Sequence, residues 1–404
     1  MRTLVVLGGS SDQLFMIRTA QEMGLRVHVF DWNPDCPGFD MADDHSVVST
    51  RDVPALKLYL DNMSRAGVDI AGVTTMGSDI PDIVAALTSH LNLPGVSVAS
   101  AQLATDKYAM KERFRERGVP IPWFQEINSA ADLRGIIDQR GYDLVIKPVD
   151  RSGSRGVFLL DDKCDIDELF SAAQGDSFSG RVQVEEYLTG LQISTETVMV
   201  GGRGVTPGFA DRNYEMLDRF RPQIMENGGW VPSILSADDR RAVERVVVEA
   251  SLALDITDGI TKGDVVMTDE GPKIIEIAAR LSGGDFCESL VPLGSGVNYV
   301  RTAIELAVGD KPDIGALAPK WDKAVANRYF FPPTGILQRI EGAAEVRAKD
   351  WVHKLEFWIE PGEQVPEITS HVSRAGVFVI TAPDRATAAD RIAWVYDTIK
   401  IMVH

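Results

Sequence analysis

A lysine followed by a stretch rich in glycine and serine is the part of this sequence best suited to binding phosphate. Lys147 follows the apolar run YDLVI directly and opens the stretch KPVDRSGSRGV. An ammonium at the end of a buried strand must face a polar cavity or an anion, because an unpaired charge in an apolar interior is costly. Gly153 and Gly156 would let backbone N–H groups approach phosphate oxygens. Ser152 and Ser154 add hydroxyl donors, but the Walker order of glycine, lysine and hydroxyl is missing, so a surface hairpin turn stays open.

Two acidic residues on neighbouring strand-like runs could hold a metal ion. The runs KGDVV and KIIEIA are joined by the turn MTDEGP, which predicts a hairpin with Asp264 and Glu276 on its two strands. Alternation would bring both carboxylates to one face, where they repel each other unless a cation lies between them. Mg²⁺ suits this arrangement, because it accepts one or two carboxylates and completes its shell with phosphate oxygens and water. Arg280 could reach the same cavity. The alternative is that both acids lie on a solvated strand face.

The glycine pair near the N-terminus matches a dinucleotide-binding turn only in part. Gly8 and Gly9 follow the first strand-like run, and Asp31 ends the second. A Rossmann site has glycines in this turn and an acid about 20 residues later for the ribose. Ser11 and Gln13 stand where further glycines are expected, so a tight strand-to-helix turn without a nucleotide is the favoured interpretation.

The composition limits the class of ligand. The 404 residues have a formal net charge of −18, which argues against nucleic acid and anionic membranes as main partners. An anionic small molecule would need a few placed cations or a metal ion. The three cysteines have neither metal-ligand nor redox spacing, which indicates a reducing compartment. No leader-like segment, membrane-spanning stretch, paired-histidine zinc motif or GxSxG elbow occurs, so we expect a cytoplasmic protein.

Several strands and helices must position these candidate residues. RTLVVLGG, RVHVFD and DIAGVTT alternate with helical patterns, which predicts an α/β unit with a parallel sheet that ends near Ala104. TDKYAMKERFRERG predicts a basic helix capped by Thr105 or Asp106. Runs after Thr189, such as TETVMV and GDVVMT, predict antiparallel sheet, with the helix DDRRAVERVVVEASLAL between them. The tail from Val377 is expected to add one strand and one amphipathic helix.

Five charged residues follow one another along the chain in a recognisable order. They are a lysine on the connector (Lys107), a lysine before the glycine-rich loop (Lys147), two acids on late strands (Asp264, Glu276) and an arginine after them (Arg280). This set resembles the ATP-grasp superfamily, which includes biotin carboxylase, D-alanine–D-alanine ligase, carbamoyl phosphate synthetase and the L-amino acid ligases. The resemblance covers essentially the whole chain and implies a fold of α/β and α+β parts. These are a Rossmann-like pre-ATP-grasp domain (1–105), a connector helix (106–121), a lid subdomain (122–188) and a large, mostly antiparallel subdomain with a terminal α/β extension (189–404).

The resemblance also implies an ATP site, and its phosphate-binding part matches residues already named. Lys107 and Lys147 look like the two phosphate-binding lysines. The loop 150–156 looks like the lid that closes over the triphosphate. Its residues expected to bind ATP are Ser152, Gly153, Ser154 and Gly156.

The base and the ribose are assigned by the same resemblance. VEEYL looks like the hinge between the two lobes. Glu185 and Glu186 would frame the adenine amino group, and the Leu188 backbone would meet the ring. For the ribose, Gln192 and Glu196 are both open.

Asp264 and Glu276 look like the family's metal ligands for Mg²⁺, with Mn²⁺ as a substitute. Arg280 and Lys147 look like the catalytic residues, with Arg280 handling the transferred phosphoryl group. Many relatives have Glu-x-Asn where this chain has Glu276-Ile277-Ala278. The number of metal ions, one or two, is therefore left open.

The implied activity is that of an ATP-dependent carboxylate–amine ligase, which forms an amide or peptide bond through an acyl phosphate and releases ADP and phosphate. Its partners would be a small carboxylate and a small amine, and we expect a homodimer. The segment 211–233 lies where related ligases contact the acceptor, although a solvated loop is an equal alternative. The residues expected to bind substrate are Gly9, Ser10, Arg212, Arg221, Glu226 and Arg280.

Three other functions remain open at this stage. The first is an ATP-grasp carboxylase or formyl-transferring ligase that acts on a purine precursor. The second is an NAD-binding oxidoreductase that uses Gly8, Gly9 and Asp31. The third is a nucleotide-binding scaffold without catalytic activity. The substrates themselves cannot be derived from the residues.

Overall fold

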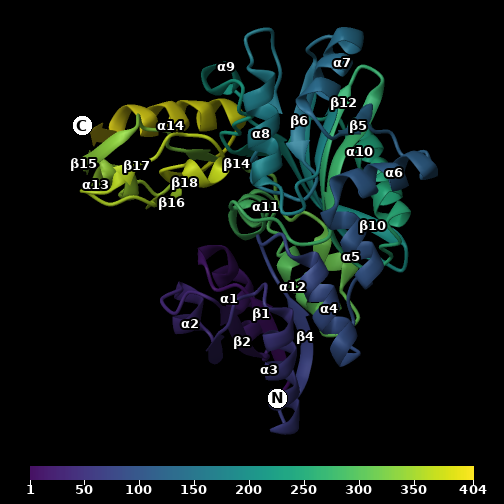
Figure 1. Ribbon diagram of the computed structural model, residues 1–404. Helices are drawn as coiled ribbons and strands as arrows, with labels where there is room; N and C mark the ends of the chain where they lie inside the picture. The colour runs from purple at the N-terminus through teal and green to yellow at the C-terminus, as the bar shows by residue number, and fades with distance from the viewer.

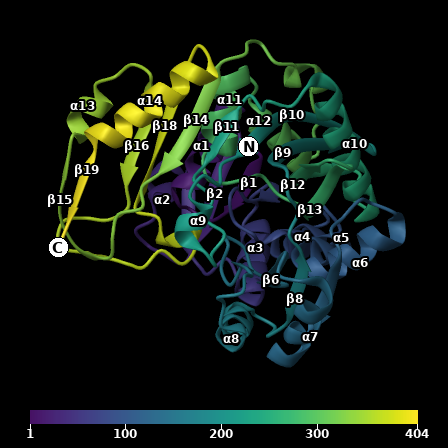
Figure 2. The same ribbon diagram turned by 90° about the horizontal axis from the view of Figure 1, so that it is seen from above.

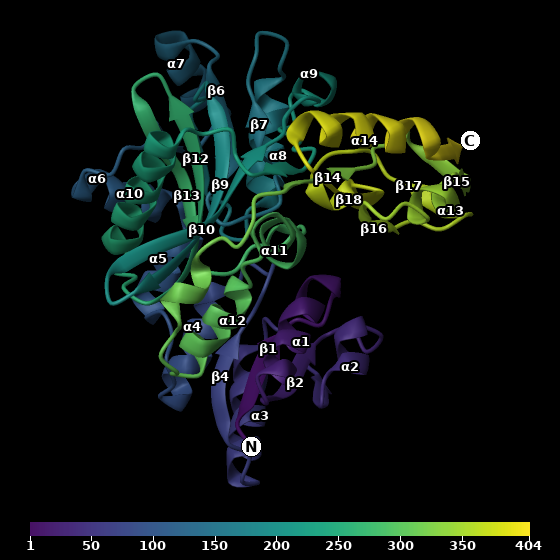
Figure 3. The same ribbon diagram turned by 180° about the vertical axis from the view of Figure 1, so that it is seen from behind.

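The computed structural model describes residues 1–404, whose strands form four β-sheets (Figure 1). The N-terminal unit, in purple, lies at the bottom of Figure 1, and the C-terminal residues, in yellow, extend to the left. Figure 3 shows the same arrangement from behind, with the C-terminal residues well separated from the N-terminal sheet. No helix combines the length and the apolar character that crossing a bilayer requires.

The N-terminal unit is a parallel sheet covered by helices. Its strands are β1 (Thr3–Leu7), β2 (Arg26–Asp31), β3 (Asp44–Val47) and β4 (Ile70–Thr74), in the order β3-β2-β1-β4. All three strand pairings are parallel, which confirms the predicted parallel sheet. Every residue of β1 is buried, as expected of a strand with helices on both faces. The helices are α1 (Leu14–Glu22), α2 (Pro37–Met41), α3 (Val53–Arg65) and α4 (Pro81–Leu91).

The turn after β1 is filled by the protein itself. Gly8 has a φ of +101°, a backbone conformation that favours glycine. The Gly9 N–H donates to Asp31 Oδ2 (2.8 Å), and Gly9 O accepts from the Gly38 N–H (2.7 Å). A Cβ added to Gly9 would lie 2.4 Å from Cys36 Sγ. The Asp31 carboxylate is therefore already used, and α2 packs on the turn, which favours a turn that holds no dinucleotide.

A pair of helices connects this unit to the next. They are α5 (Val98–Thr105) and α6 (Lys107–Arg117). Of the two predicted N-caps of the basic helix, the structure uses Asp106, whose carboxylate accepts from the N–H groups of Tyr108 and Ala109. Gly118, with a φ of +72°, ends the helix. These two ends fix the direction in which Lys107 leaves the first turn.

A small sheet follows, with the order β5-β8-β6-β7 and antiparallel pairings. Its strands are β5 (Phe124–Ile127), β6 (Leu144–Pro148), β7 (Phe158–Leu159) and β8 (Val182–Glu186), and its helices are α7 (Ala130–Arg140) and α8 (Ile166–Asp176). Leu133, Ile146 and Phe170 belong to a separate apolar core of this unit. The helices cover one face of the small sheet and leave the other face available for polar side chains.

The large sheet has eight strands in the order β13-β12-β9-β10-β11-β14-β18-β16. All of its pairings are antiparallel, as predicted from the alternating runs. The strands are β9 (Leu191–Val200), β10 (Arg203–Arg212), β11 (Gly229–Val231), β12 (Gly259–Thr268), β13 (Gly271–Ala278), β14 (Ala324–Tyr329), β16 (Val352–Phe357) and β18 (Gly376–Ala382). The helices are α9 (Leu217–Phe220), α10 (Ala237–Ala253), α11 (Val291–Ser295) and α12 (Tyr299–Ala307). Seen from above in Figure 2, this sheet runs from α10 to the yellow C-terminal helix.

The C-terminal region completes the fold with a third antiparallel sheet of order β17-β15-β19. Its strands are β15 (Gly335–Glu341), β17 (Gln364–Val365) and β19 (Lys400–Val403), and its helices are α13 (Ala343–Arg347) and α14 (Arg385–Thr398). The tail was expected to hold one strand and one helix, but its last residues form β19. Four residues are too few to show a period, and the partner strand β15 lies far back in the sequence.

Candidate functional site

A cavity of about 500 Å³ lies where the small sheet, the large sheet and the C-terminal region meet. Binding sites for small molecules usually have this size. Eight of its lining residues are lysine or arginine and six are aspartate or glutamate, although the whole chain has a net charge of −18. The cavity thus concentrates positive charge in an acidic protein, which suits a strongly anionic ligand. The cations are Lys107, Lys147, Arg151, Arg155, Arg212, Lys262, Arg280 and Arg374.

The two acids predicted as metal ligands share one face of a hairpin. Asp264 on β12 pairs directly with Glu276 on β13, and both line the cavity. Glu276 Oε2 lies 3.3 Å from Lys107 Nζ. Asp264 Oδ2 lies 2.5 Å from Lys262 Nζ and 3.1 Å from Arg212 Nη1. Cations therefore compensate both carboxylates in this structure.

The donor set of this hairpin fits a hard divalent cation. No group of three or more histidine, cysteine, aspartate or glutamate side chains could hold a metal ion anywhere in residues 1–404. An ion at Asp264 and Glu276 would therefore have two protein carboxylates and would take its other ligands from phosphate and water, which is the habit of Mg²⁺.

Electrostatics keep Glu276 ionised. Burial alone would raise the pKa of its carboxyl, but the ammonium groups of Lys107 and Lys262 lower that pKa below its ordinary value. For Lys107, burial lowers the pKa of the ammonium, and the Glu276 carboxylate outweighs this effect and raises it. Both side chains are charged at neutral pH, so either can exchange its present partner for a ligand of opposite charge.

A buried charge cluster joins α6 to the small sheet. Lys147 on β6 and Lys111 on α6 both pair with Glu185 on β8, and Lys111 Nζ lies 2.9 Å from Glu185 Oε2. Lys111 is fully buried, and burial lowers the pKa of its ammonium to about 8 despite the opposing effect of Glu185. Lys147 and Glu185 line the cavity, whereas Lys111 lies behind them. The Glu185 carboxylate, expected beside adenine, lines the cavity and pairs with these two lysines.

The loop after β6 carries two arginines, Arg151 and Arg155, that the sequence interpretation left out. Both line the cavity. Lys107 Nζ donates to Arg151 O (2.8 Å), and Arg155 Nε donates to Ser152 O (2.8 Å). These contacts give the loop a defined shape in which two further cations accompany the two predicted lysines.

The glycines and serines of this loop divide into two roles. Ser152, Gly153 and Ser154 line the cavity. Gly156 does not line it, but its φ is +66° and an added Cβ would lie 2.9 Å from a ring atom of Pro148. Gly156 is therefore needed for the turn of the loop. Gly153 O accepts from the N–H of His371, which holds the loop against the C-terminal region.

The hinge residues form the apolar end of the cavity. Glu186 and Leu188 line it together with Val145 and Ile275. The Glu186 carboxylate accepts from the N–H of Trp123 (3.2 Å). Apolar side chains at the end of β8 provide an environment that suits a purine base.

The two candidates for the ribose contact are separated by the structure. Gln192 lines the cavity, whereas Glu196, four residues farther along β9, is fully buried and does not. Ser282 Oγ donates to the Glu196 carboxylate, and Cys287 Sγ lies 3.8 Å from it. Burial raises the pKa of Glu196 to about 7. Glu196 therefore supports the floor of the site, and Gln192 is the ribose candidate that remains.

Replacing Glu196 with Gln should stabilise the protein at pH 8 but not at pH 5. The folded-state pKa of about 7 lies above the ordinary 4.5, so wild-type stability falls as the pH rises between these values. This shift corresponds to about 3 kcal/mol. The measurement is the midpoint of thermal unfolding of both proteins at the two pH values. Equal differences at pH 5 and pH 8 would contradict the raised pKa, because the effects of all other titrating groups cancel in the comparison.

Some of the residues expected to bind substrate line the cavity, and others lie outside it. Arg212, Glu226 and Arg280 line the cavity. Arg221 does not, since it is partly exposed and pairs with Asp218 on its own helical turn (3.2 Å). Gly9 and Ser10 also lie outside, because Gly9 packs on Gly38.

The cavity contains other groups from both ends of the chain. Asp12, in the loop that was expected to contribute Gly9 and Ser10, lines the cavity in their place. Arg280 Nε lies 3.3 Å from Asp79 Oδ1, next to the start of α4. Arg374 donates to Glu226 O, and its guanidinium lies over the Tyr329 ring (3.7 Å to the centroid). The C-terminal region therefore forms one wall of the site.

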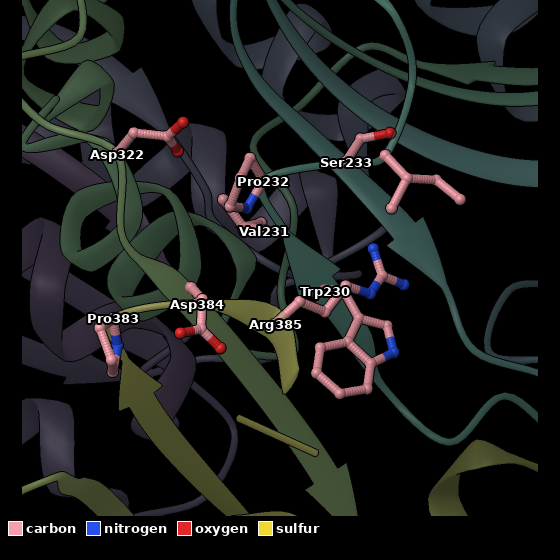
Figure 4. A pocket seen from close by; sticks show the side chains of 10 residues that line it. Trp230, Val231, Pro232, Ser233, Asp322, Pro383, Asp384 and Arg385 are labelled. Atoms are coloured by element: carbon pink, nitrogen blue, oxygen red, sulfur yellow. The ribbon is translucent and has the colours of Figure 1, made fainter. Parts of the chain in front are cut away.

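A smaller cavity of about 250 Å³ lies beside β11 and the start of α14 (Figure 4). Trp230 and Arg385 lie side by side there, with the guanidinium 4.7 Å from the ring centroid. Arg385 is already paired with the buried Asp211. Neither a lysine nor a second arginine lines this cavity, so it lacks the charge that a polyphosphate needs.

Two family models match this chain. An ATP-grasp domain model matches residues 104–284, and the model of the L-amino acid ligase C-terminal domain 2 matches residues 328–404. The first range contains α6, the small sheet and the acidic hairpin. The second contains the wall that carries His371 and Arg374.

Known proteins resemble the chain over most of its length. The uncharacterized protein y4rH of Sinorhizobium fredii is 26% identical over 90% of this chain and 75% of its own length. The D-alanine–D-alanine ligase of Bordetella avium is 26% identical over 54% of this chain and 69% of its own. Among solved structures, the L-amino acid ligase from Bacillus licheniformis superposes with a TM-score of 0.83 at 20% identity, covering 100% of this chain and 99% of that one.

These matches agree with the fold and with the position of the cavity between two lobes. The chain therefore has the ATP-grasp fold, with an ATP-grasp domain over residues 104–284 followed by an L-amino acid ligase C-terminal domain 2 over residues 328–404.

Proposed function

We propose that this protein is an ATP-dependent carboxylate–amine ligase that joins two small molecules through an acyl phosphate and releases ADP and phosphate. One observation carries the proposal. In an acidic chain, Lys107, Lys147 and Arg280 converge with the facing acids Asp264 and Glu276 in a single cavity. This combination provides charge for a polyphosphate and oxygen ligands for its metal ion in the same place.

The nucleotide would lie along the cavity from the hinge to the hairpin. The base would occupy the apolar end at Leu188 and Val145, and Gln192 would contact the ribose. The triphosphate would then meet Lys147, Lys107 and the N–H groups of the loop at Ser152 to Ser154. Asp264 and Glu276 would hold Mg²⁺, which supplies neutralising charge at the phosphate oxygens when bound.

The chemistry consists of two displacements. A carboxylate oxygen of the first substrate attacks the γ-phosphorus, and the bond to the β–γ bridging oxygen breaks as ADP leaves. The amine nitrogen of the second substrate then attacks the acyl carbon, loses a proton, and expels phosphate as the C–O bond breaks. Arg280 lines the same cavity, and its guanidinium would stabilise charge on the transferred group. Phosphoryl transfer needs alignment and charge compensation more than a nucleophilic side chain.

Exclusion of water is the second requirement, because an exposed acyl phosphate would hydrolyse. The loop 150–156 is held on one side by the contact of Lys107 with Arg151 O and on the other by the contact of His371 with Gly153 O. The wall from the C-terminal region and the glycine-rich loop thus close the same end of the cavity. This supports a loop that covers the phosphates during the reaction.

For the substrates, we infer that at least one is an amino acid. Arg212 and Arg374 present guanidinium groups beside Glu226, so one cluster offers both signs of charge. A zwitterion needs both. Burial alone would raise the pKa of Glu226, but Arg212 and Arg374 lower it, so the acid stays ionised.

Thermal unfolding with ligands tests the nucleotide site first. ATP with Mg²⁺ at 100 times its Kd should stabilise the protein by about 2.7 kcal/mol, whereas NAD should leave the midpoint unchanged. A shift with NAD alone would contradict the proposal. Release of ADP is then measured across pairs of amino acids, and against bicarbonate or formate with a ribonucleotide. ADP that appears only with the ribonucleotide would favour the purine-precursor enzymes instead.

A further inference from the structure

The strand pairing of the acidic hairpin places Lys262 opposite Ala278, the position at which many relatives have a further metal ligand. In the ladder between β12 and β13, Asp264 pairs with Glu276 and Lys262 pairs with Ala278, with no irregularity between these two pairs. Residues two apart on a strand, and residues directly opposite each other, lie on the same face of a sheet. Lys262, Asp264, Glu276 and Ala278 therefore form one group of four on the face toward the cavity.

The Lys262 ammonium is held by one carboxylate of this group. Its Nζ lies 2.5 Å from Asp264 Oδ2, and its side chain is 16% exposed. Arg212 approaches the same Asp264 oxygen from the other side, at 3.1 Å. Lys262, Asp264 and Glu276 all line the same cavity. The ammonium therefore lies against the Asp264 carboxylate and is largely shielded from solvent.

Ala278 explains why a lysine fits here. Its methyl group offers no ligand atom. A divalent ion needs several oxygen ligands, and next to an ammonium it would also be repelled. This face can therefore hold one metal ion between Asp264 and Glu276. The place beside it, near Ala278, is already taken by the positive charge of Lys262.

We propose that the Lys262 ammonium replaces a second metal ion, so that the nucleotide complex holds one divalent cation at Asp264 and Glu276. This inference rests on the proposed function. Lys262 would contact phosphate oxygens directly, as a fixed monovalent charge beside a single metal ion. It would supply charge that does not depend on the free concentration of the divalent ion.

Metal stoichiometry tests this directly, without turnover. Mn²⁺ is titrated into the full chain saturated with a non-hydrolysable ATP analogue, and free Mn²⁺ is followed by electron paramagnetic resonance. We expect one bound Mn²⁺ per chain for the wild type. The double variant Lys262→Met with Ala278→Asn removes the ammonium and restores an oxygen ligand, and it should bind two.

Matched controls separate the charge from the added ligand. Ala278→Asn alone should still bind one Mn²⁺, because Lys262 remains. Lys273→Met with Ala278→Asn should also bind one, since Lys273 is on the same hairpin but pairs with Glu270 outside the cavity. Two ions in either control would overturn the role of Lys262, as would a single ion in the Lys262→Met double variant.

The wild-type value decides the question even if a variant fails to fold. Two Mn²⁺ per wild-type chain, with the analogue bound, would overturn the inference and leave the proposed function intact. Failure of the wild type to bind the analogue with Mn²⁺ would overturn both.

Discussion

Glu276→Gln should remove most of the ADP release and leave the fold intact. Glu276 is one of only two carboxylates that face each other across the hairpin, and the amide of glutamine cannot supply the lost negative charge to a divalent ion. Turnover should fall by about 10²- to 10³-fold, the usual effect of removing a group that compensates transition-state charge. ADP release with a productive substrate pair is the measurement, and thermal unfolding checks the fold.

The matched control is Glu270→Gln in the turn of the same hairpin. Glu270 has a side chain that is 77% exposed and pairs only with Lys273. Glu270→Gln makes the same change of charge at a residue that does not line the cavity, so turnover should be unchanged. A Glu276→Gln enzyme that releases ADP at the wild-type rate would remove the basis for the metal site, since Asp264 alone cannot hold Mg²⁺ at this face.

The acidic hairpin shows what local patterns can predict. The turn MTDEGP fixed the loop between two runs, and alternation then determined which residues share a face. The observed pairing of Asp264 with Glu276 confirms the predicted hairpin. The same alternation also places Lys262 on the cavity face, two residues before Asp264.

Lys111 was missed for a related reason. It follows Lys107 by four residues on α6, which puts both lysines on one side of the helix. The sequence of α6 is strongly charged all around, so a periodic apolar face does not identify which side is buried. The partner Glu185 comes from β8, and only tertiary packing brings it to the helix.

The residues that failed to reach the cavity show the limit of motif reasoning. Gly9 and Ser10 follow a first strand in a familiar way, but whether that turn faces a ligand depends on α2, which packs Gly38 against Gly9. Arg221 lies in an irregular segment whose direction no period predicts, and it pairs with Asp218. Such positions are decided by contacts between distant parts of the chain.

Lys147→Met should weaken nucleotide binding far more than Lys111→Met, although both lysines pair with the same carboxylate. Each variant leaves Glu185 with one remaining lysine, so each should lose a comparable stability of about 1–3 kcal/mol. Only Lys147 lines the cavity. Its loss removes a charged contact to phosphate, which is worth about 1.5–3 kcal/mol, or roughly 10- to 100-fold in Kd.

The pair of variants therefore separates a phosphate contact from a structural charge. Affinity for ATP with Mg²⁺ is measured by calorimetry, and stability by unfolding in urea without ligand. Equal losses of affinity in the two variants would mean that Lys147 acts only by holding Glu185 in place. A large loss of affinity in Lys147→Met alone would mean that the two lysines have different roles. Lys111, buried behind the cavity, would compensate the Glu185 charge, and Lys147 would contact the nucleotide.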